Sequence, residues 1–330
     1  MTQRTLGPFS VSAISLGCMN LSHAYGAPPD ETSAIKLLNQ ALDMGYSMLD
    51  SAALYGFGAN ESLLGKAVMH RRDEFILASK CGMFKNDAGV REIDGHPDVL
   101  RKTCEDSLKR LGTDIIDLYY LHRWDRRVPI EESVGALSDL VSEGKIRTIG
   151  LSEVSSDTLR KAHAVHPITA LQTEYSLWTR NPEIGPLDTC EELGVAFVAF
   201  SPLGRGFLTG KLEDIASFEE KDIRRNMPRF QPQNYTRNLG LLDGLQQIAR
   251  EHLCSLAQLS LAWLLTKSAN IIPIPGTTKL DHMQENLAAL ELGINDETIA
   301  KMDSLINQNT VYGARYNRAT QAEIDTEEFD

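Results

Sequence analysis

Four ionisable side chains lie at or just after the ends of strand-like segments in the first 122 residues. "YSMLD" ends in Asp50 with Tyr55 shortly after it, "FILASK" ends in Lys80, and "IIDLYYLH" ends in His122. Burying an ionised carboxylate without a partner is costly, so Asp50 needs a counter-ion, and Lys80 is the natural one. A lysine held in this way beside Tyr55 is expected to lower the pKa of the tyrosine from about 10. Tyr55 would then act as a general acid that protonates an oxyanion, with His122 hydrogen-bonded to the same oxygen.

Each of these residues also has an ordinary structural explanation. Asp50 could cap the turn that follows its strand, and Tyr55 could simply be a packing residue. Lys80 could be solvated, and His122 could be a hydrogen-bonded residue at the rim. Taken singly, each ordinary explanation is favoured. Their joint placement at neighbouring strand ends favours a shared site.

The elements that must position these side chains alternate between strand-like and helix-like patterns. Eight strands are predicted, each followed by a helix, near residues 13–17, 46–50, 75–79, 115–121, 147–151, 169–174, 195–200 and 271–274. Eight βα units predict an α/β fold of the (β/α)8, or TIM-barrel, type, whose active site lies at the carboxyl ends of the strands. A doubly wound sheet is the alternative, but "GCMNLSHAYG" after the first strand does not match G-x-G-x-x-G.

Residues 1–330 are expected to form one domain, in which the segments outside the βα units are additions to the barrel. "RTLGPFSVS" predicts a small β-hairpin before the barrel, and loop and helix additions are expected at the C-terminal end. One helix is predicted between Asp30, a suitable N-cap, and Gly45, a suitable stop. Residues 203–237 show no clear periodicity.

Composition narrows the function class. The chain has 330 residues, 42% of them hydrophobic, and a formal net charge of −12. Such an acidic chain argues against a general nucleic-acid or anionic-membrane surface. The N-terminus is too polar for a signal peptide, and no apolar run approaches the ~20 residues of a membrane span. The five scattered cysteines offer no zinc spacing and suit a reducing cytosol, so we expect a cytoplasmic protein without a metal.

Several motifs together resemble the aldo/keto reductases. "DSAALYG" is similar to that family's D-x-A-x-x-Y-G signature, and "LASK" and "YYLHRWD" are similar to its lysine and histidine segments. "RTIGLSEVS", "LQTEYSLWTR", "VAFVAFSPLGRGFLTGK" and "IPIPGTTKLDHMQENLAAL" follow in the family's order. The resemblance covers essentially the whole chain, and the "LSEVS" and "SPLGRGFLTG" forms look most like a bacterial and fungal branch. It places Asp50, Tyr55, Lys80 and His122 on the family's catalytic tetrad.

The resemblance implies an NADPH/NADP+ cofactor that lies across the barrel mouth. Ser152 and Gln172 would hold the nicotinamide carboxamide, and Phe200 would stack on the nicotinamide ring. "SPLGRG" and "GTTK" would bind phosphates through backbone N–H groups and a helix N-terminus. Lys279 and Thr277, with Arg205, would hold the 2′-phosphate, and Glu285 and Asn286 would contact adenine. The expected cofactor-binding residues are Ser152, Gln172, Phe200, Ser201, Pro202, Leu203, Gly204, Arg205, Gly206, Gly276, Thr277, Lys279, Glu285 and Asn286.

One position departs from the family pattern. Many relatives carry asparagine where this chain has Glu153. A glutamate cannot donate a hydrogen bond to the carboxamide oxygen. Whether Glu153 contacts the nicotinamide is therefore an open question at this point.

We expect NADPH-dependent reduction of an aldehyde or ketone to an alcohol, so the partner is a small carbonyl compound. The resemblance is also compatible with a homo-oligomer. Met19, Phe84 and Trp124 are the expected substrate contacts. Residues 81–96, residues 203–237 and the tail after Val311 should complete the pocket walls. Two other functions remain open. The first is a cofactor-binding regulatory subunit of the kind found in channels. The second is a metal-dependent hydrolase or a Schiff-base aldolase that uses Lys80. The sequence lacks the His-x-His motif that is usual in such hydrolases.

Overall fold

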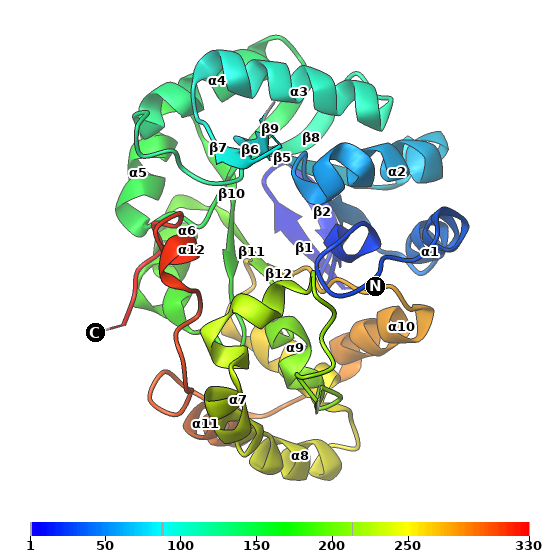
Figure 1. Cartoon of the computed structure of the whole chain (residues 1–330), viewed down its shortest axis with the longest axis vertical. Helices are drawn as coiled ribbons and strands as arrows, with labels where there is room; N and C mark the ends of the chain where they lie inside the picture. Colours follow the sequence, from blue (N-terminus) through cyan, green and yellow to red (C-terminus); the bar gives the residue numbers. More distant parts are fainter. Residues whose placement is uncertain (1, 87–88, 213, 330) are drawn as a thin grey trace.

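Eight parallel strands form one sheet at the centre of the computed structural model, which describes residues 2–86, 89–212 and 214–329 (Figure 1). Neighbours in the sheet follow the order β12-β11-β10-β9-β8-β5-β4-β3. The strands are β3 (Leu16–Gly17), β4 (Met48–Asp50), β5 (Ile76–Cys81), β8 (Ile116–Leu121), β9 (Ile146–Ser152), β10 (Ile168–Glu174), β11 (Ala196–Phe200) and β12 (Ile271–Pro273). Each overlaps a predicted strand.

The two edges of this sheet meet. Gly17 forms a parallel bridge with Gly276, and the Ser15 N–H donates to the Pro273 carbonyl at 2.9 Å. These contacts join β3 to β12 and close the sheet into a barrel. The predicted TIM barrel is thus confirmed, and all strand carboxyl ends open on one face.

The N-terminal hairpin closes the opposite end of the barrel. Strands β1 (Gln3–Leu6) and β2 (Phe9–Ser12) pair antiparallel, as predicted. Leu6 and Val11 are fully buried and pack against barrel-interior side chains such as Met48 and Leu118. The interior is therefore a packed core, and a ligand can enter only from the carboxyl-end face.

Helices surround the barrel (Figure 1). The principal helices are α1 (Glu31–Asp43), α2 (Ala59–Val68), α3 (Pro97–Leu111), α4 (Ile130–Ser142), α5 (Ser156–Val165), α6 (Pro186–Leu193), α9 (Leu256–Lys267) and α10 (Leu280–Ala288). Helix α1 begins where predicted, because the Asp30 side chain accepts a hydrogen bond from the Ser33 N–H. No helix among the described residues is both long and apolar enough to cross a bilayer.

Further elements extend the loops on the open face and the C-terminal end. A hairpin of β6 (Met83–Lys85) and β7 (Arg91–Ile93) follows β5, where a loop was expected. After β11 come short 3-10 turns, α7 (Pro232–Leu239) and α8 (Leu241–Glu251). Helix α11 (Asp296–Leu305) packs on α8, and the short α12 (Arg318–Gln321) precedes the end of the chain. Asp87, Ala88 and Glu213, within the predicted pocket walls, lie outside the described residues.

Candidate active site

The four predicted catalytic side chains meet at the carboxyl ends of three adjacent strands. Asp50 is the last residue of β4, Lys80 is near the end of β5, and His122 directly follows β8. Tyr55 begins a 3-10 turn, Tyr55–Gly58, in the loop after β4. The short loop carries the tyrosine back over the strand ends, which accounts for the close sequence spacing of Asp50 and Tyr55.

Asp50 and Lys80 form the predicted buried ion pair. The Lys80 ammonium binds the Asp50 carboxylate and also donates to the Ser51 carbonyl at 2.7 Å and the Tyr55 hydroxyl at 3.2 Å. The second carboxylate oxygen of Asp50 accepts from Gln172 Nε2 at 2.8 Å. Both charged groups are almost completely buried. Such a pair is tolerated because three acceptors surround the ammonium and both carboxylate oxygens have a donor.

The electrostatics of Tyr55 differ from the expected direction. Burial raises the pKa of Tyr55 above its ordinary value, and the adjacent Lys80 ammonium offsets only part of that rise. The prediction of a lowered tyrosine pKa is therefore wrong for the protein without ligand, because desolvation of the phenolate outweighs its attraction to the cation. For Lys80, burial favours the neutral amine, but Asp50 more than compensates and the lysine pKa is raised. Tyr55 is thus protonated and Lys80 charged at neutral pH.

His122 is a neutral imidazole. Burial lowers its pKa well below the usual range, and the nearby Arg123 and Lys80 charges lower it further. Its ring lies edge-on to Tyr55 with centroids 5.9 Å apart. Nδ1 is buried without a hydrogen-bond partner among the described residues, so Nε2 is the nitrogen left to face a ligand. A neutral histidine can donate one hydrogen bond from that position.

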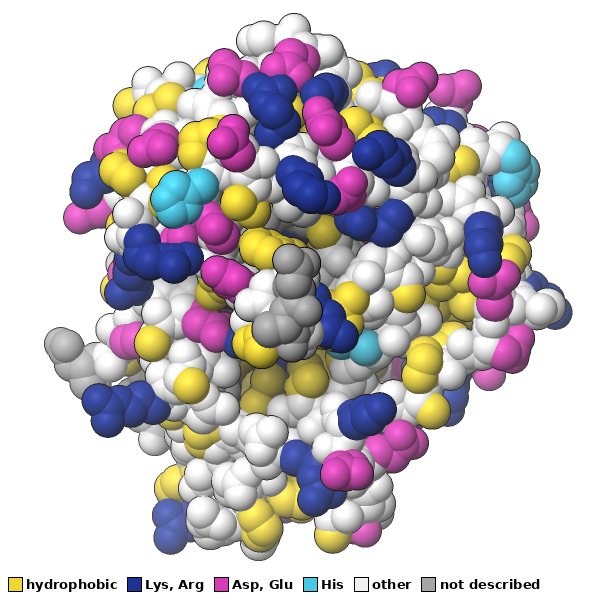
Figure 2. Space-filling model, turned by 45° about the horizontal axis from the view of Figure 1, so that its top comes forward, with side chains coloured by type: hydrophobic (Ala, Val, Ile, Leu, Met, Phe, Trp, Pro, Cys, Tyr) yellow, Lys and Arg dark blue, Asp and Glu magenta, His cyan; other side chains and the backbone are white. Residues whose placement is uncertain are grey.

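A cavity of about 970 Å³ opens over these side chains. Figure 2 shows hydrophobic side chains set back in a hollow on this face, while Lys and Arg are interspersed with Asp and Glu around it. The predicted residues that line the cavity are Met19, Asp50, Tyr55, His122, Ser152, Gln172, Phe200, Ser201, Pro202, Leu203, Arg205, Gly206, Gly276, Thr277, Lys279, Glu285 and Asn286. Nearly all predicted site residues are thus brought together, although they come from seven different loops or strand ends.

Three predicted contacts do not line this cavity: Gly204, Phe84 and Trp124. Trp124 packs against the main core and donates its indole N–H to the Val128 carbonyl at 2.9 Å. Phe84 lies in β6, but the neighbouring Met83 and, from β7, Arg91 reach the cavity instead. The strand alternation of the unpredicted hairpin decides which of its side chains face inward.

Arg205 is engaged inside the protein. Its guanidinium pairs with the buried Glu174 at 2.7 Å and donates to the hydroxyls of Tyr316 at 2.9 Å and Tyr25 at 3.2 Å. Its charge is therefore matched within the protein. Lys279, in contrast, is exposed at the start of α10 and forms no ion pair among the described residues.

Glu153 holds the C-terminal segment. Its side chain accepts from Arg315, from the Thr326 hydroxyl at 2.7 Å and from the Glu174 N–H at 3.0 Å. The residue is almost fully buried and has a left-handed backbone, with φ of 57°. The glutamate that departs from the family pattern thus anchors the tail whose Tyr316 lines the cavity.

Some cavity residues were not found from the sequence. His23 lies against Tyr55 with ring centroids 5.5 Å apart, and Arg123 lines the cavity beside His122. Both occupy loops after barrel strands, and that position was the available signal for polar residues near the site. Tyr316 and Glu323, in contrast, come from the tail after Val311, which was expected to complete the pocket walls and does line the cavity.

Comparison with known proteins agrees with this architecture. The sequence profile of the Aldo/keto reductase family matches residues 13–307. The chain belongs to the aldo/keto reductase family. It is 43% identical over 319 residues to the aldo-keto reductase yakc [NADP(+)] of Schizosaccharomyces pombe, covering 95% of this chain and 94% of the relative. It is 41% identical over 326 residues to a probable aldo-keto reductase 1 of Glycine max, covering 96% and 93%.

Solved structures of aldo/keto reductases have the same fold. The glycerol dehydrogenase of Gluconobacter oxydans superposes with a TM-score of 0.84 at 28% identity, covering 92% of this chain and 94% of that chain. An aldo-keto reductase from Bacillus halodurans, in its holo form, superposes with a TM-score of 0.76 at 29% identity, covering 94% and 98%.

Proposed function

We propose that this aldo/keto reductase reduces aldehydes or ketones to alcohols with NADPH, and that Tyr55 donates the proton. The observation that carries the proposal is the Tyr55 hydroxyl, held 3.2 Å from a buried ammonium at the wall of a large cavity. A hydroxyl in this position can protonate a carbonyl oxygen while hydride adds to the carbonyl carbon. The raised tyrosine pKa suits this direction, because the donor keeps its proton until the substrate needs it.

Each neighbour of Tyr55 has a role in that proton transfer. When Tyr55 gives up its proton, the Lys80 ammonium stabilises the resulting phenolate. Asp50 holds Lys80 in place, and Gln172 in turn holds Asp50, because the Lys80 ammonium binds one carboxylate oxygen of the aspartate and Gln172 Nε2 donates to the other. His122 donates from Nε2 to the same carbonyl oxygen and so orients the substrate.

The cavity residues fit a nicotinamide dinucleotide. Phe200 offers a half-buried aromatic face at the end of β11, and Ser152 and Gln172 offer polar groups on the neighbouring strand ends. Residues 201–203, 205–206 and 276–279 line the cavity beyond β11 and β12, where this fold commonly binds phosphate. Lys279, which forms no ion pair in the described part of the chain, adds a cation there for a 2′-phosphate. Bound in this cavity, NADPH would supply the hydride. The name of the S. pombe relative, which includes NADP(+), also supports this cofactor.

Steady-state turnover tests the proposal. The purified protein is mixed with NADPH and a panel of aromatic, aliphatic and dicarbonyl substrates, and loss of reduced-nicotinamide absorbance is followed. Substrate-dependent NADPH oxidation with formation of the alcohol is expected. Tight NADPH binding without turnover on any substrate would instead favour a regulatory module that keeps the cofactor site.

A further inference from the structure

Arg123 is a cation in the cavity wall that has no acidic partner among the described residues. It follows His122 in the chain, lines the cavity and is half-buried. Its contacts with the described residues are both made by Nη1, which donates to the His122 carbonyl at 2.6 Å and the Ser152 hydroxyl at 3.1 Å. The edge formed by Nε and Nη2 has no acceptor from the described part of the chain. That edge is the part of a guanidinium that binds a carboxylate through two parallel hydrogen bonds.

Most other cations around the cavity are neutralised by a neighbouring carboxylate. Arg91 pairs with Glu323, and Lys211 lies 3.6 Å from Glu285. Arg205 and Arg224 pair with Glu174 and Asp222, at 2.7 and 2.6 Å. Among the arginines of the described residues that line the cavity, Arg123 is therefore the exception.

Lys279 is the other cavity cation without an ion pair in the described ranges, and it lies across the barrel from Arg123. Lys279 follows β12, whereas Arg123 follows β8, and these strands stand four places apart in the closed eight-stranded sheet. The two cations therefore cannot serve the same anionic group. Because Lys279 lies beside the proposed phosphate loops, the anion that meets Arg123 must be a different one.

Arg123 lies near the place where the substrate carbonyl is expected to bind. It neighbours His122 in sequence, and its Nη1 contacts the Ser152 side chain at the end of the adjacent strand. The guanidinium is thus fixed at the wall that His122 shares, on the side where the substrate carbonyl must lie. A substrate carboxylate a few bonds from the carbonyl could reach the free guanidinium edge while its carbonyl oxygen meets Tyr55.

We propose that Arg123 is a specificity-determining residue that binds a carboxylate of the substrate, so that the preferred substrates are oxo acids. This inference rests on the proposed carbonyl reduction and specifies its substrate class. The carboxylate would accept from Nε and Nη2, while Nη1 keeps its bonds to the protein. This ion pair fixes one orientation of the bound substrate, in which its carbonyl meets Tyr55 and His122. A neutral aldehyde has no carboxylate to form the ion pair, so its orientation is not fixed in this way.

The test uses rigid substrate pairs that differ only in charge. The ortho, meta and para carboxybenzaldehydes are compared with the corresponding carbamoylbenzaldehydes and with benzaldehyde, and kcat/KM is measured with NADPH. The wild type should prefer the acid over the amide by about 10-fold or more for the isomer whose spacing matches Arg123. Arg123→Gln should remove that preference, and Arg123→Lys should retain part of it.

Arg126→Gln is the matched control. It removes the same charge three residues away, from an exposed arginine that contacts Asp325 and the Ile324 carbonyl and does not line the cavity. Its acid-to-amide ratio should equal that of the wild type. An unchanged ratio in Arg123→Gln, or no acid preference in the wild type, would overturn the proposal. So would a weaker NADPH affinity of Arg123→Gln with its acid preference intact, because Arg123 would then serve the cofactor.

The proposed reduction and this inference fail in different ways. Turnover of benzaldehyde supports the reduction whatever happens to the acid preference. If no aldehyde is reduced, binding of the three carboxybenzyl alcohols to the NADP+-loaded protein is measured by calorimetry. Binding that is lost in Arg123→Gln would support the carboxylate site, and absence of binding to the wild type would overturn it.

Discussion

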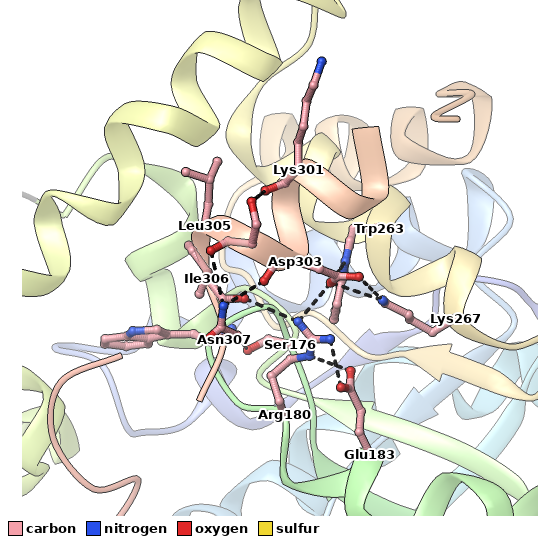
Figure 3. Close-up of polar contacts among 12 residues, drawn as sticks. Ser176, Arg180, Glu183, Trp263, Lys267, Lys301, Asp303, Leu305, Ile306 and Asn307 are labelled. Atoms are coloured by element: carbon pink, nitrogen blue, oxygen red, sulfur yellow. Dashed lines mark hydrogen bonds and ion pairs between the residues drawn. The ribbon is translucent and has the colours of Figure 1, made fainter. Parts of the chain in front are cut away.

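Two networks of acidic and basic side chains in this protein have different purposes. One is the Asp50–Lys80 pair beneath Tyr55 at the barrel mouth. The other joins Arg180, after β10, to Glu183 and to Asp303 on α11 (Figure 3). The first pair is fully buried, whereas in the second network only Arg180 is buried and its two carboxylate partners are partly exposed. They differ in what they leave without a partner.

In the α11 network every strong donor has a protein acceptor. Arg180 donates from Nε and Nη2 to Glu183 and from Nη1 to Asp303 at 2.9 Å. Asp303 also accepts from Lys267 Nζ and Trp263 Nε1, both at 2.9 Å (Figure 3). None of these side chains is among the described residues that line the cavity of about 970 Å³. Such a satisfied network fixes α11 against α9 and the loop after β10.

At the barrel mouth, the satisfied pair supports groups that remain available. Lys80 and Asp50 are fully hydrogen-bonded, whereas the Tyr55 hydroxyl has only Lys80 as a partner and the His122 ring has none among the described residues. Both rings line the cavity. The comparison indicates that function is marked by unused hydrogen-bonding capacity beside a cavity, and that buried charge alone does not mark it.

The largest effect is expected from Lys80→Met. This change removes the cation that stabilises a Tyr55 phenolate and leaves Asp50 buried without its counter-charge. Turnover should fall by roughly 10²-fold or more, and an unpaired buried carboxylate costs about 3–5 kcal/mol if it stays ionised. Single-turnover NADPH oxidation and thermal melting measure the two losses.

The double variant Lys80→Met/Asp50→Asn tests whether Asp50 acts through Lys80. Because both residues act on Tyr55 as a unit, the double variant should turn over little more slowly than Lys80→Met alone. Its stability should be at least as high, since no charge is left unpaired. Strictly additive losses of rate in this four-member cycle would mean that Asp50 serves something other than Lys80.

The α11 network should respond in stability and leave the chemistry intact. Asp303→Asn should lower the free energy of unfolding by roughly 1–2 kcal/mol, a modest value because the carboxylate is 32% exposed. The kcat of the folded enzyme should stay near the wild-type value. A loss of kcat comparable to that of Lys80→Met would remove the distinction between the two networks.

The pH dependence of this loss follows from the pKa of Asp303. Burial alone would raise that pKa, but Lys267 and Arg180 hold it below the ordinary value. A carboxyl with a depressed folded-state pKa stabilises the protein above its unfolded-state pKa, and this contribution disappears as pH falls through the folded-state pKa. The difference in melting temperature between wild type and Asp303→Asn should therefore be largest near neutral pH. It should disappear as the pH falls below about 4.

A smaller effect is expected at the cofactor end. Lys279 is exposed and unpaired in the described structure, so its attraction for a 2′-phosphate is partly screened. Lys279→Ala should reduce the preference for NADPH over NADH by a few-fold to about 10-fold. Rising salt should weaken the wild-type preference in the same direction. Equal wild-type affinity for the two cofactors, from fluorescence titration, would contradict the assignment.

The sequence allowed the barrel, and the meeting of Asp50, Tyr55, Lys80 and His122 at its mouth, to be predicted because their signals are local. Strand ends can be located from apolar runs, and a βα barrel brings all carboxyl ends to one face. The parts that were missed depend on contacts between distant residues. Gln172 reaches Asp50 across 122 positions, and Glu153 reaches Arg315 across 162. Strands β6 and β7 have three residues each, too few for a periodic pattern.

The direction in which the pKa of Tyr55 is shifted could not be predicted from the sequence either. The residues indicated that a cation would stand beside the tyrosine, which is correct. The net shift depends on how completely the ring is desolvated, and that follows from packing by neighbours such as His23. Burial and charge act in opposite directions here, and only the folded structure decides which prevails.

Single-turnover hydride transfer by Tyr55→Phe tests the central claim most directly. The substitution removes one hydroxyl from a ring that contacts His23 and His122, so folding and NADPH affinity should be retained. The rate of NADPH oxidation by a saturating aldehyde should fall by roughly 10²-fold or more, with the NADPH dissociation constant unchanged. A rate close to that of the wild type on every aldehyde tested would contradict the assignment of Tyr55 as the proton donor.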